Sequence, residues 1–314
     1  MKFGQWLDIW LDKYVKYAVK SKTYISYKQI VKNHIQLKLG VYEFDELTPL
    51  VLQEFMLELF EHGNQKTGGR LAAGSVKLIM SLLNLSLAQA NFYEITQKTL
   101  ANKIRLPLVE ARKVTSFERK EQTLIENFCL SSKKANYLGI IICLYTGIRI
   151  GELLALCWDD LDLKNGILSI SKTAYQANVF GRFEIVVDTP KSKSSVREIP
   201  LPKNLVGMLK KMKKKSKSKY VISTRFGTMV GTRSYQKTFE LIQKKLHIPY
   251  KNFHALRHTF ATRALEVGMD VKTVSEILGH KNALITLSRY SHSLMSHKRA
   301  MMNKLSKTLC FPAI

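Results

Sequence analysis

Hydrophobic side chains recur at three- and four-residue intervals through the first hundred residues, with polar side chains between them. The first such face consists of Phe3, Trp6, Leu7, Trp10, Leu11 and Tyr14. Further faces begin near Ser21, after Thr48–Pro49 and at Gly74–Ser75. A threonine followed by a proline, as at Thr48–Pro49, is a typical helix start. This spacing is that of amphipathic α-helices. It predicts a compact, all-helical unit over residues 1–105.

The pattern changes after that unit. Leu106–Pro107 and Arg112–Lys113 interrupt the periodicity and predict an extended basic linker over residues 106–115. Ser116 is placed to cap the next helix, and the apolar run Leu138–Tyr145 predicts a buried helix. Three later segments have the alternation and β-branched content of strands: Gly166–Ser171, Phe183–Asp188 and Val196–Leu201. We therefore expect a mixed α+β domain over residues 116–314, and a chain that is mainly α with a small antiparallel β-sheet.

The composition adds a strong excess of positive charge. The 314 residues include 50 Lys and Arg against 24 Asp and Glu, a formal net charge of +26 that is spread along the chain. Binding of a polyanion releases counterions from its phosphates, and no basic amphipathic anchor for an acidic membrane stands out. The charge therefore favours nucleic acid as the partner. The run Lys210–Lys215 predicts only the solvated end of a helix.

Nothing in the sequence indicates a membrane or an export route. No apolar run approaches the roughly 18 residues that span a bilayer, and the acidic, amphipathic N-terminus is unlike a signal peptide. We expect a cytoplasmic protein without a membrane partner. The four cysteines show no C-x-x-C spacing, so they are expected to be reduced and to hold no zinc.

Two arginines lie in apolar surroundings. Arg149 is part of T-G-I-R-I-G-E, and Arg257 is part of H-A-L-R-H. A buried guanidinium needs an anionic partner, and its planar fork suits the two non-bridging oxygens of a phosphodiester. The alternative is an internal salt bridge to Glu152 or Asp159.

Histidines accompany the second arginine. His254 and His258 lie four residues apart on a predicted helix, a spacing that would also suit a metal. No glutamate stands between them as a base, and Arg257 would repel a cation, so no metal site is expected. His280 follows Leu278–Gly279, where a glycine is expected to end a helix.

Five segments, in this order, resemble those of the tyrosine recombinase (phage integrase) family. They are T-G-I-R-I-G-E-L-L-A-L, T-P-K-S-K-S-S-V-R-E-I-P-L, H-A-L-R-H-T-F-A-T, L-G-H and T-L-S-R-Y-S-H, across residues 146–292. The resemblance implies a site-specific DNA recombinase that works through a 3′-phosphotyrosyl intermediate and a four-way junction, without a metal, ATP or another cofactor. It also implies a helical core-binding domain over residues 1–105 and a catalytic domain over residues 116–314.

The same resemblance implies roles for single residues. Arg149 and Arg257 are expected to hold the scissile phosphate, with Glu152 orienting Arg149. His254 is expected to assist proton transfer, and His280 to donate a hydrogen bond to the phosphate.

Two further roles depend on the resemblance alone. Lys191 matches the lysine that protonates the leaving 5′ oxygen, although the usual Lys-Thr is Lys-Ser here and Lys193 is close enough to compete. Tyr290 matches the nucleophile. It is one of 13 tyrosines, and spacing alone does not single it out.

The implied partners are double-stranded DNA at specific recombination sites and further copies of the chain. Candidate DNA contacts are Lys66, Arg70, Ser75, Lys77 and Lys193, and a solvated helix end is the alternative for the first four. A homo-tetramer is implied in which Met301–Ile314 docks on a neighbouring protomer, and a simple terminal helix is the alternative.

The chain begins almost directly at the predicted core-binding helices, with no room for the arm-binding domain of many phage and conjugative-element integrases. This favours a resolvase or inverting type of recombinase, and a shortened chain is the alternative. The resemblance also implies a prokaryotic protein that is associated with the nucleoid when bound. The rival hypotheses are a type IB topoisomerase-like enzyme that relaxes DNA as a monomer, and a non-catalytic DNA-binding protein.

Overall fold

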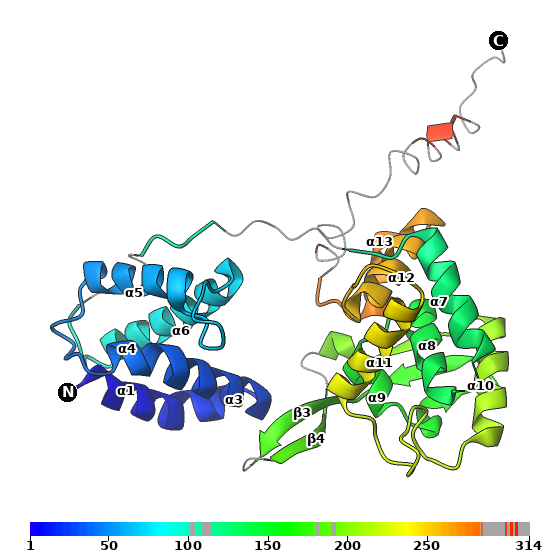
Figure 1. Cartoon of the computed structure of the whole chain (residues 1–314), viewed down its shortest axis with the longest axis horizontal. Helices are drawn as coiled ribbons and strands as arrows, with labels where there is room; N and C mark the ends of the chain where they lie inside the picture. Colours follow the sequence, from blue (N-terminus) through cyan, green and yellow to red (C-terminus); the bar gives the residue numbers. More distant parts are fainter. Residues whose placement is uncertain are drawn as a thin grey trace. The chain divides into compact units, whose positions relative to one another are not determined.

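The structure is a computed structural model of the whole chain. It describes residues 1–98, 100, 104–108, 115–132, 134–179, 182–189, 193–282, 284, 299, 302–303 and 305–306. The chain divides into two compact units, unit 1 (Met1–Arg112) and unit 2 (Lys113–Ile314), which are coloured blue to cyan and green to red in Figure 1.

Unit 1 is helical throughout its described elements. The first helix runs through α1 (Phe3–Ile9), the π-helical segment η1 (Trp10–Val15) and α2 (Lys16–Ala18), and the second through α3 (Ser21–Ile30), η2 (Val31–Gln36) and α4 (Leu37–Leu39). Two longer helices follow, α5 (Pro49–His62) and α6 (Ala73–Phe92). The N-cap of α5 is Thr48, whose hydroxyl accepts a hydrogen bond from the Val51 backbone N–H at 3.2 Å. The predicted helix start at Thr48–Pro49 is confirmed.

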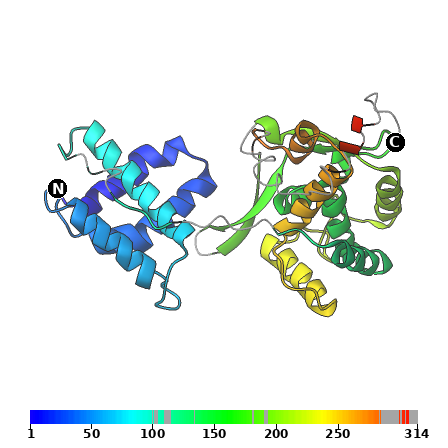
Figure 2. The same cartoon turned by 90° about the horizontal axis from the view of Figure 1, so that it is seen from above.

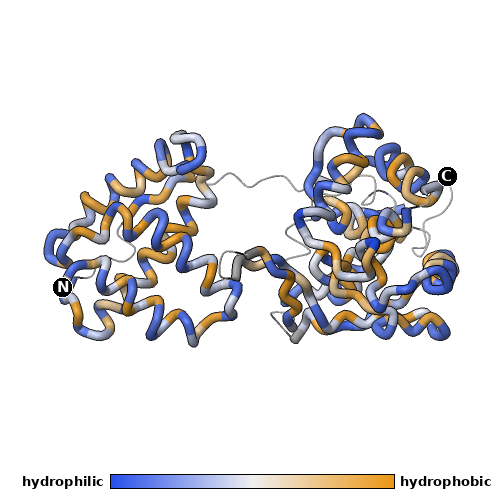
Figure 3. The backbone as a smooth tube through the Cα atoms, turned by 60° about the horizontal axis from the view of Figure 1, so that its bottom comes forward, coloured by the Kyte–Doolittle hydropathy of each residue, from blue (hydrophilic) through white to orange (hydrophobic). Residues whose placement is uncertain are grey.

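The hydrophobic faces expected in unit 1 form its core. Trp6, Trp10 and Leu83 are fully buried. In Figure 3, hydrophobic and hydrophilic stretches alternate along the backbone of the unit that holds the N-terminus. The indole N–H of Trp6 donates to the Ser86 hydroxyl at 3.2 Å, so even the polar atom of this side chain is satisfied inside the core. The amphipathic spacing in the sequence therefore corresponds to burial of one helix face.

The helices of unit 2 precede and follow a small β-region. Before the strands come α7 (Arg119–Ser131), η3 (Ala135–Tyr137), α8 (Leu138–Thr146), α9 (Ile150–Ala155) and η4 (Trp158–Asp160). After them come α10 (Lys203–Lys215), α11 (Thr232–Lys245), α12 (His254–Glu266) and α13 (Val271–Leu278). The predicted buried helix at Leu138–Tyr145 is confirmed as α8.

The strands form two antiparallel sheets. One has the order β1 (Leu161–Asp162), β2 (Ile167–Ile170), β5 (Arg197–Pro200), with the short helix η5 (Lys193–Ser195) before β5. The other is a hairpin of β3 (Thr173–Val179) and β4 (Arg182–Asp188) that extends from the helical body of unit 2 (Figures 1 and 2). The predicted fold class is confirmed, and the three predicted strands correspond to β2, β4 and β5.

Two sequence predictions need correction here. The strands β1 and β3 were not predicted: β1 has only two residues, and β3 reads T-A-Y-Q-A-N-V, with small and polar residues that weaken the strand pattern. The cap expected at Ser116 is also wrong by two residues. Glu118 is the N-cap of α7, because Glu118 and Glu121 bond each other's backbone N–H groups as a capping box.

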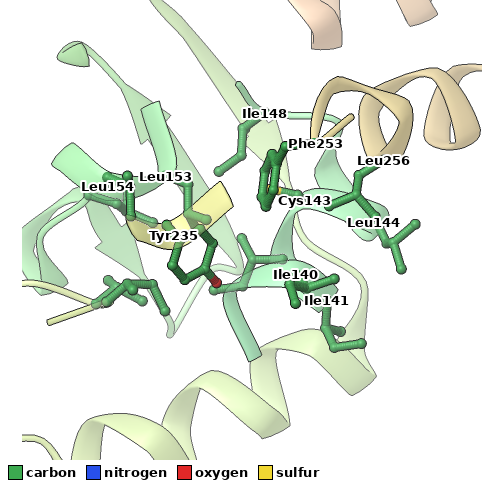
Figure 4. Packing of buried hydrophobic residues seen from close by; sticks show 14 of the residues in the cluster. Ile140, Ile141, Cys143, Leu144, Ile148, Leu153, Leu154, Tyr235, Phe253 and Leu256 are labelled. Atoms are coloured by element: carbon green, nitrogen blue, oxygen red, sulfur yellow. The ribbon is translucent and has the colours of Figure 1, made fainter. Parts of the chain in front are cut away.

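The core of unit 2 joins the helices α8, α9 and α11. Cys143 on α8, Leu153 and Leu154 on α9, and Tyr235 on α11 belong to one buried cluster (Figure 4). The Tyr235 hydroxyl donates to the Asn136 carbonyl at 2.5 Å. Among the described residues, no helix has the length and apolar character that crossing a membrane requires.

Candidate active site

Arg149 stands at a tight connection between α8 and α9. The connection begins at Gly147, the left-handed C-cap of α8 with φ of 66°. A Cβ at this position would lie 2.5 Å from a Phe260 ring carbon and 2.6 Å from a Leu278 methyl carbon, so glycine is required by conformation and by space. Two residues later Arg149 is the N-cap of α9, and its side chain is 36% exposed.

Glu152 is the anionic centre of the site. It is 3% exposed and accepts from Arg149 twice: from Nη1 to Oε1 at 2.7 Å and from the backbone N–H to Oε2 at 2.9 Å. Arg197 also bonds both oxygens, from Nη2 to Oε2 at 2.9 Å and from Nη1 to Oε1 at 3.3 Å. The salt bridge that the sequence offered as an alternative for Arg149 is therefore present.

Burial by itself raises the pKa of Glu152. The hydrogen bond and charge of Arg197, followed by the charge of Arg149 and its backbone N–H, outweigh that effect and hold the pKa below its ordinary value. Glu152 is therefore a carboxylate at neutral pH, and it fixes the position of two guanidinium groups.

Arg257 approaches the same place from α12. It is 2% exposed, and its guanidinium donates from Nη1 to the Gly147 carbonyl at 2.9 Å and from Nη2 to the Leu278 carbonyl at 2.7 Å. These bonds tie α12 to the end of α8 and to the end of α13. Two backbone carbonyl oxygens thus accept hydrogen bonds from this buried arginine.

Carbonyl groups at the C-terminal end of α13 accept hydrogen bonds from all three arginines. Arg197 donates to the Ile277 carbonyl at 2.5 Å, Arg257 to the Leu278 carbonyl, and Arg149 to the Gly279 carbonyl at 3.2 Å. The last carbonyls of a helix lack intrahelical partners and carry partial negative charge, so cations are favourable there. One helix end therefore gathers three guanidinium groups.

His280 is placed by the way α13 ends. Gly279 has φ of 64°, its N–H donates to the Glu276 carbonyl at 2.9 Å, and the His280 N–H donates to the Ser275 carbonyl at 3.0 Å. This is the Schellman arrangement that glycine permits. The predicted helix end at Leu278–Gly279 is confirmed, and it brings His280 next to the carbonyl that Arg149 bonds.

The histidines of α12 lie in its first two turns. His254 is the first helical residue, and its ring contacts that of His258 edge-on, with ring centroids 4.6 Å apart. The shared helix face predicted from their spacing is confirmed. In the part of the chain that the structure describes, no three His, Cys, Asp or Glu side chains are grouped so as to hold a metal ion.

Four of the other predicted residues are described on unit 1, and two lie outside the described residues. Lys191 and Tyr290 lie outside the described residues, as does most of Met301–Ile314, and of Lys193 the structure describes the backbone, in η5. Lys66, Arg70, Ser75 and Lys77 are exposed on unit 1, in the loop between α5 and α6 and at the start of α6. The guanidinium of Arg70 lies over the Phe60 ring, 4.7 Å from its centroid.

Arg197 has no role in the sequence prediction, although it stands within the segment V-R-E-I-P-L. Its side chain is 7% exposed, in the middle of the cluster. The sequence does contain a signal: along a strand Arg197 shares a face with Ile199, which is buried. A charged side chain on the buried face of a strand needs a partner, and that partner is Glu152.

Taken together, the geometry suits an oxyanion. Two guanidinium groups bond one carboxylate, and a third, that of Arg257, bonds the same helix end. Arg149 is held in place by Glu152 and is still 36% exposed. Arginine in such a setting binds phosphate through its planar fork, and the fixed donors need no reorganisation when charge develops.

Two family profiles match the chain. The profile of the phage integrase family matches residues 116–297, more than half of the chain, and that of the phage integrase N-terminal SAM-like domain matches residues 2–60.

Curated relatives match over most of the chain. A tyrosine recombinase XerC-like protein of Caldanaerobacter subterraneus subsp. tengcongensis is 26% identical over 331 residues, which cover 96% of this chain and 82% of that protein. The transposase from transposon Tn916 of Enterococcus faecalis is 25% identical, covering 86% of this chain and 69% of that protein. The ICEBs1 integrase of Bacillus subtilis is 26% identical, covering 92% of this chain and 79% of that protein.

Solved structures share the fold. The Tn1549 transposon integrase in complex with transposon right end DNA has a TM-score of 0.80 at 23% identity, covering 98% of this chain and 100% of that chain. A lambda integrase tetramer bound to a Holliday junction has a TM-score of 0.70 at 20% identity, covering 90% of this chain and 78% of that chain.

Proposed function

The chain belongs to the phage integrase family of tyrosine recombinases, whose members cleave and rejoin DNA through a tyrosine, and from this premise we propose which residues carry the reaction here. Arg149 and Arg257 hold the scissile phosphate, Glu152 fixes Arg149, His254 assists proton transfer, and His280 donates to a phosphate oxygen. One observation carries this assignment: the arginines and the backbone of His280 meet at the end of α13.

For the covalent step, the roles of Tyr290 and Lys191 come from the resemblance, because both lie outside the described residues. The Tyr290 hydroxyl passes its proton to His254 as its oxygen attacks the phosphorus. The bond to the 5′ oxygen breaks, and that oxygen takes a proton from Lys191, or from Lys193 as the alternative. The product is a 3′-phosphotyrosyl link and a free 5′ hydroxyl. Attack by the 5′ hydroxyl of another strand reverses these changes and releases the tyrosine. The energy of the broken phosphodiester is kept in the link, so the exchange needs no external energy source.

We assign DNA recognition to both units. Residues 1–105 form the core-binding domain, residues 106–115 the linker, and residues 116–314 the catalytic domain; the family profiles at residues 2–60 and 116–297 support this division. The exposed side chains Lys66, Arg70, Ser75 and Lys77 contact the DNA backbone or groove. The net charge of +26 and the DNA in the Tn1549 integrase structure support double-stranded DNA as the substrate.

The assembly we propose is a homo-tetramer on paired sites, with Met301–Ile314 of each protomer docked on its neighbour. The lambda integrase tetramer on a Holliday junction, a protein with this fold, supports the four-subunit arrangement. The relatives named above are recombinases, integrases and transposases, which does not favour the topoisomerase alternative.

Covalent capture tests the proposal. The substrates are nicked duplexes from the flanks of the gene and a library with a randomised centre, incubated with the protein in EDTA. We expect a protein–DNA adduct that survives SDS with the wild type and is lost with Tyr290→Phe. Tyr250→Phe is the matched control, because Tyr250 is an exposed tyrosine of the same unit. An adduct that persists in Tyr290→Phe, or no adduct on any duplex, would contradict the proposal.

A further inference from the structure

Arg197 connects three separate elements of unit 2. It bonds both carboxylate oxygens of Glu152 on α9, the Ile277 carbonyl at the end of α13, and the Ser195 carbonyl of η5 at 3.0 Å. Arg197 itself begins β5, the strand that follows the segment containing Lys191 and Lys193. A single side chain therefore fixes the relation between the carboxylate, the α13 end and the start of that strand.

The donors of Arg197 are committed to the protein. A guanidinium has five N–H groups, and four hydrogen bonds leave this one: one from Nε, two from Nη1 and one from Nη2. Five minus four leaves one N–H, whereas a guanidinium fork binds a phosphate through two, so Arg197 is not placed to hold a substrate phosphate itself. Any effect of Arg197 on catalysis has to pass through the groups that it holds.

Glu152 is the group through which such an effect reaches Arg149. Each carboxylate oxygen of Glu152 accepts from both arginines, at distances from 2.7 to 3.3 Å. The bidentate hydrogen bond with Arg197 allows the carboxylate one orientation. In that orientation the carboxylate accepts hydrogen bonds from the Nη1 and the backbone N–H of Arg149. Without the fork of Arg197, the carboxylate is able to turn, and Arg149 turns with it.

The end of α13 supplies an independent observation of the same kind. A Cβ on Gly279 would lie 3.0 Å from Nη1 and 3.1 Å from Cδ of Arg197, and 3.1 Å from the Ser194 carbonyl oxygen. Arg197 and the residues before it are thus packed directly on the turn that carries His280. The close fit ties the start of β5 to α13 as well as to Glu152.

We propose that Arg197 is a positioning residue of the recombination reaction: it aligns Arg149 with the scissile phosphate by holding Glu152 against the end of α13. This inference rests on the proposed function and adds a residue to it. It predicts that loss of the Arg197 fork weakens the electrostatic contact of Arg149 with the phosphate, beyond any effect on folding.

The test compares two substrates that differ in charge. A duplex captured by the wild-type protein is prepared with a normal scissile phosphate and with a methylphosphonate, in which a methyl group replaces one non-bridging oxygen and removes the negative charge. We expect Arg197→Lys, which keeps the charge but loses the fork, to slow single-turnover adduct formation by about 10- to 100-fold on the phosphate. On the methylphosphonate we expect a loss of less than about threefold, because the misplaced charge of Arg149 no longer matters.

Arg263→Lys is the matched control. Arg263 on α12 also donates from all three nitrogens, to Gln122, Glu266 and the Phe117 carbonyl, but it has no contact with Glu152 among these bonds. Arg263→Lys measures the cost of losing a structural arginine fork in the same unit. The rate of adduct formation by this variant is expected to fall equally on the two substrates. A loss for Arg197→Lys that is equal on the two substrates, or no loss at all, would overturn the positioning role.

A second measurement needs no DNA. The Glu152 carboxyl is followed by ¹³C NMR through a pH titration, with Glu152→Gln to assign its signal. Arg197→Lys is expected to raise the pKa of Glu152, and Arg263→Lys to leave it unchanged; an unchanged pKa in both would overturn the proposal. Failure of the proposed function is distinguishable, because in that case the wild-type protein itself forms no adduct.

Discussion

Glu152 is the residue on which the arginine cluster depends. It is buried, it bonds Arg149 and Arg197 at once, and the pairing keeps it ionised in spite of its burial. Removing one partner of a buried pair leaves the other charge desolvated without compensation, which costs more than the pair contributes. The same residue is therefore important both for folding of unit 2 and for the position of Arg149.

Glu152→Gln keeps the shape but removes the charge, and we expect it to lower the free energy of unfolding of unit 2 by about 3–5 kcal/mol at pH 7. Because the folded pKa lies below the ordinary value of 4.5, the charge of Glu152 stabilises the protein fully above that value and loses its effect as the pH falls through the folded pKa.

Urea unfolding at neutral and acidic pH measures both effects. The wild type is expected to lose more stability than Glu152→Gln between pH 7 and pH 3, so the difference between the two proteins shrinks on acidification. A difference that stays constant over this range would show that the charge of Glu152 is not what stabilises the cluster.

At the scale of elements, the end of α13 organises the site. Its last carbonyls accept hydrogen bonds from Arg197, Arg257 and Arg149. Its terminal glycine places His280 beside these carbonyls. The helix end works as a common acceptor for side chains that come from β5, α12 and the start of α9. A change in the geometry of this turn therefore alters several functional groups together.

Gly279→Ala tests that claim. The substitution forces an alanine into a left-handed conformation, which costs about 1–2 kcal/mol, and its methyl group also meets Arg197 and Ser194. Gly268→Ala is the matched control, because Gly268 has φ of 90° and nothing within 4 Å of an added Cβ. We expect Gly279→Ala to be the less stable of the two by a further 1–3 kcal/mol or so, and to reduce adduct formation, which Gly268→Ala does not.

Equal destabilisation by the two glycine substitutions, measured by urea unfolding, would contradict the packing of Arg197 on the α13 turn. Equal rates of adduct formation would contradict the role of this turn in the site.

The sequence predicted much of this arrangement, and the exceptions have physical reasons. The glycine at the end of α13 and the shared face of His254 and His258 depend on local rules, which the sequence carries directly. The contact of Arg197 with Glu152 joins residues 45 positions apart, and strand alternation alone does not say which carboxylate an inward arginine meets. The hairpin strand β3 was missed because five of its seven side chains are small or polar.

At the scale of the whole molecule, positive charge is the dominant property. The net charge of +26 is distributed over both units, while the arginine cluster uses only a few of these charges. Phosphate neutralisation along a duplex gives affinity that falls with salt, and contacts made by single lysines and arginines carry no base specificity. We therefore expect most of the basic residues to bind DNA in general, and the arginine cluster to act on one phosphate.

The loop between α5 and α6 provides the corresponding prediction. Lys66→Ala with Arg70→Ala is expected to weaken duplex binding and to lower the slope of log K against log salt concentration by about 2, because two phosphate contacts are lost. Lys210→Ala with Lys214→Ala is the matched control, since these exposed lysines of α10 have the same charge and no assigned contact. Fluorescence anisotropy over a salt series gives the slopes, and equal slopes for the two double variants would contradict a DNA contact at the α5–α6 loop.

The central claim is covalent attack by Tyr290 on a phosphate held by the arginine cluster, and the most direct measurement is the identity of the linked atom. The adduct formed by the wild-type protein is digested with trypsin and nuclease and analysed by mass spectrometry. The account predicts a nucleotide on the peptide Tyr290–Lys298, joined through the tyrosine to a 3′ phosphate, and loss of the adduct when Arg149 is replaced by alanine. A nucleotide on any other tyrosine, or a link to the 5′ phosphate, would contradict it.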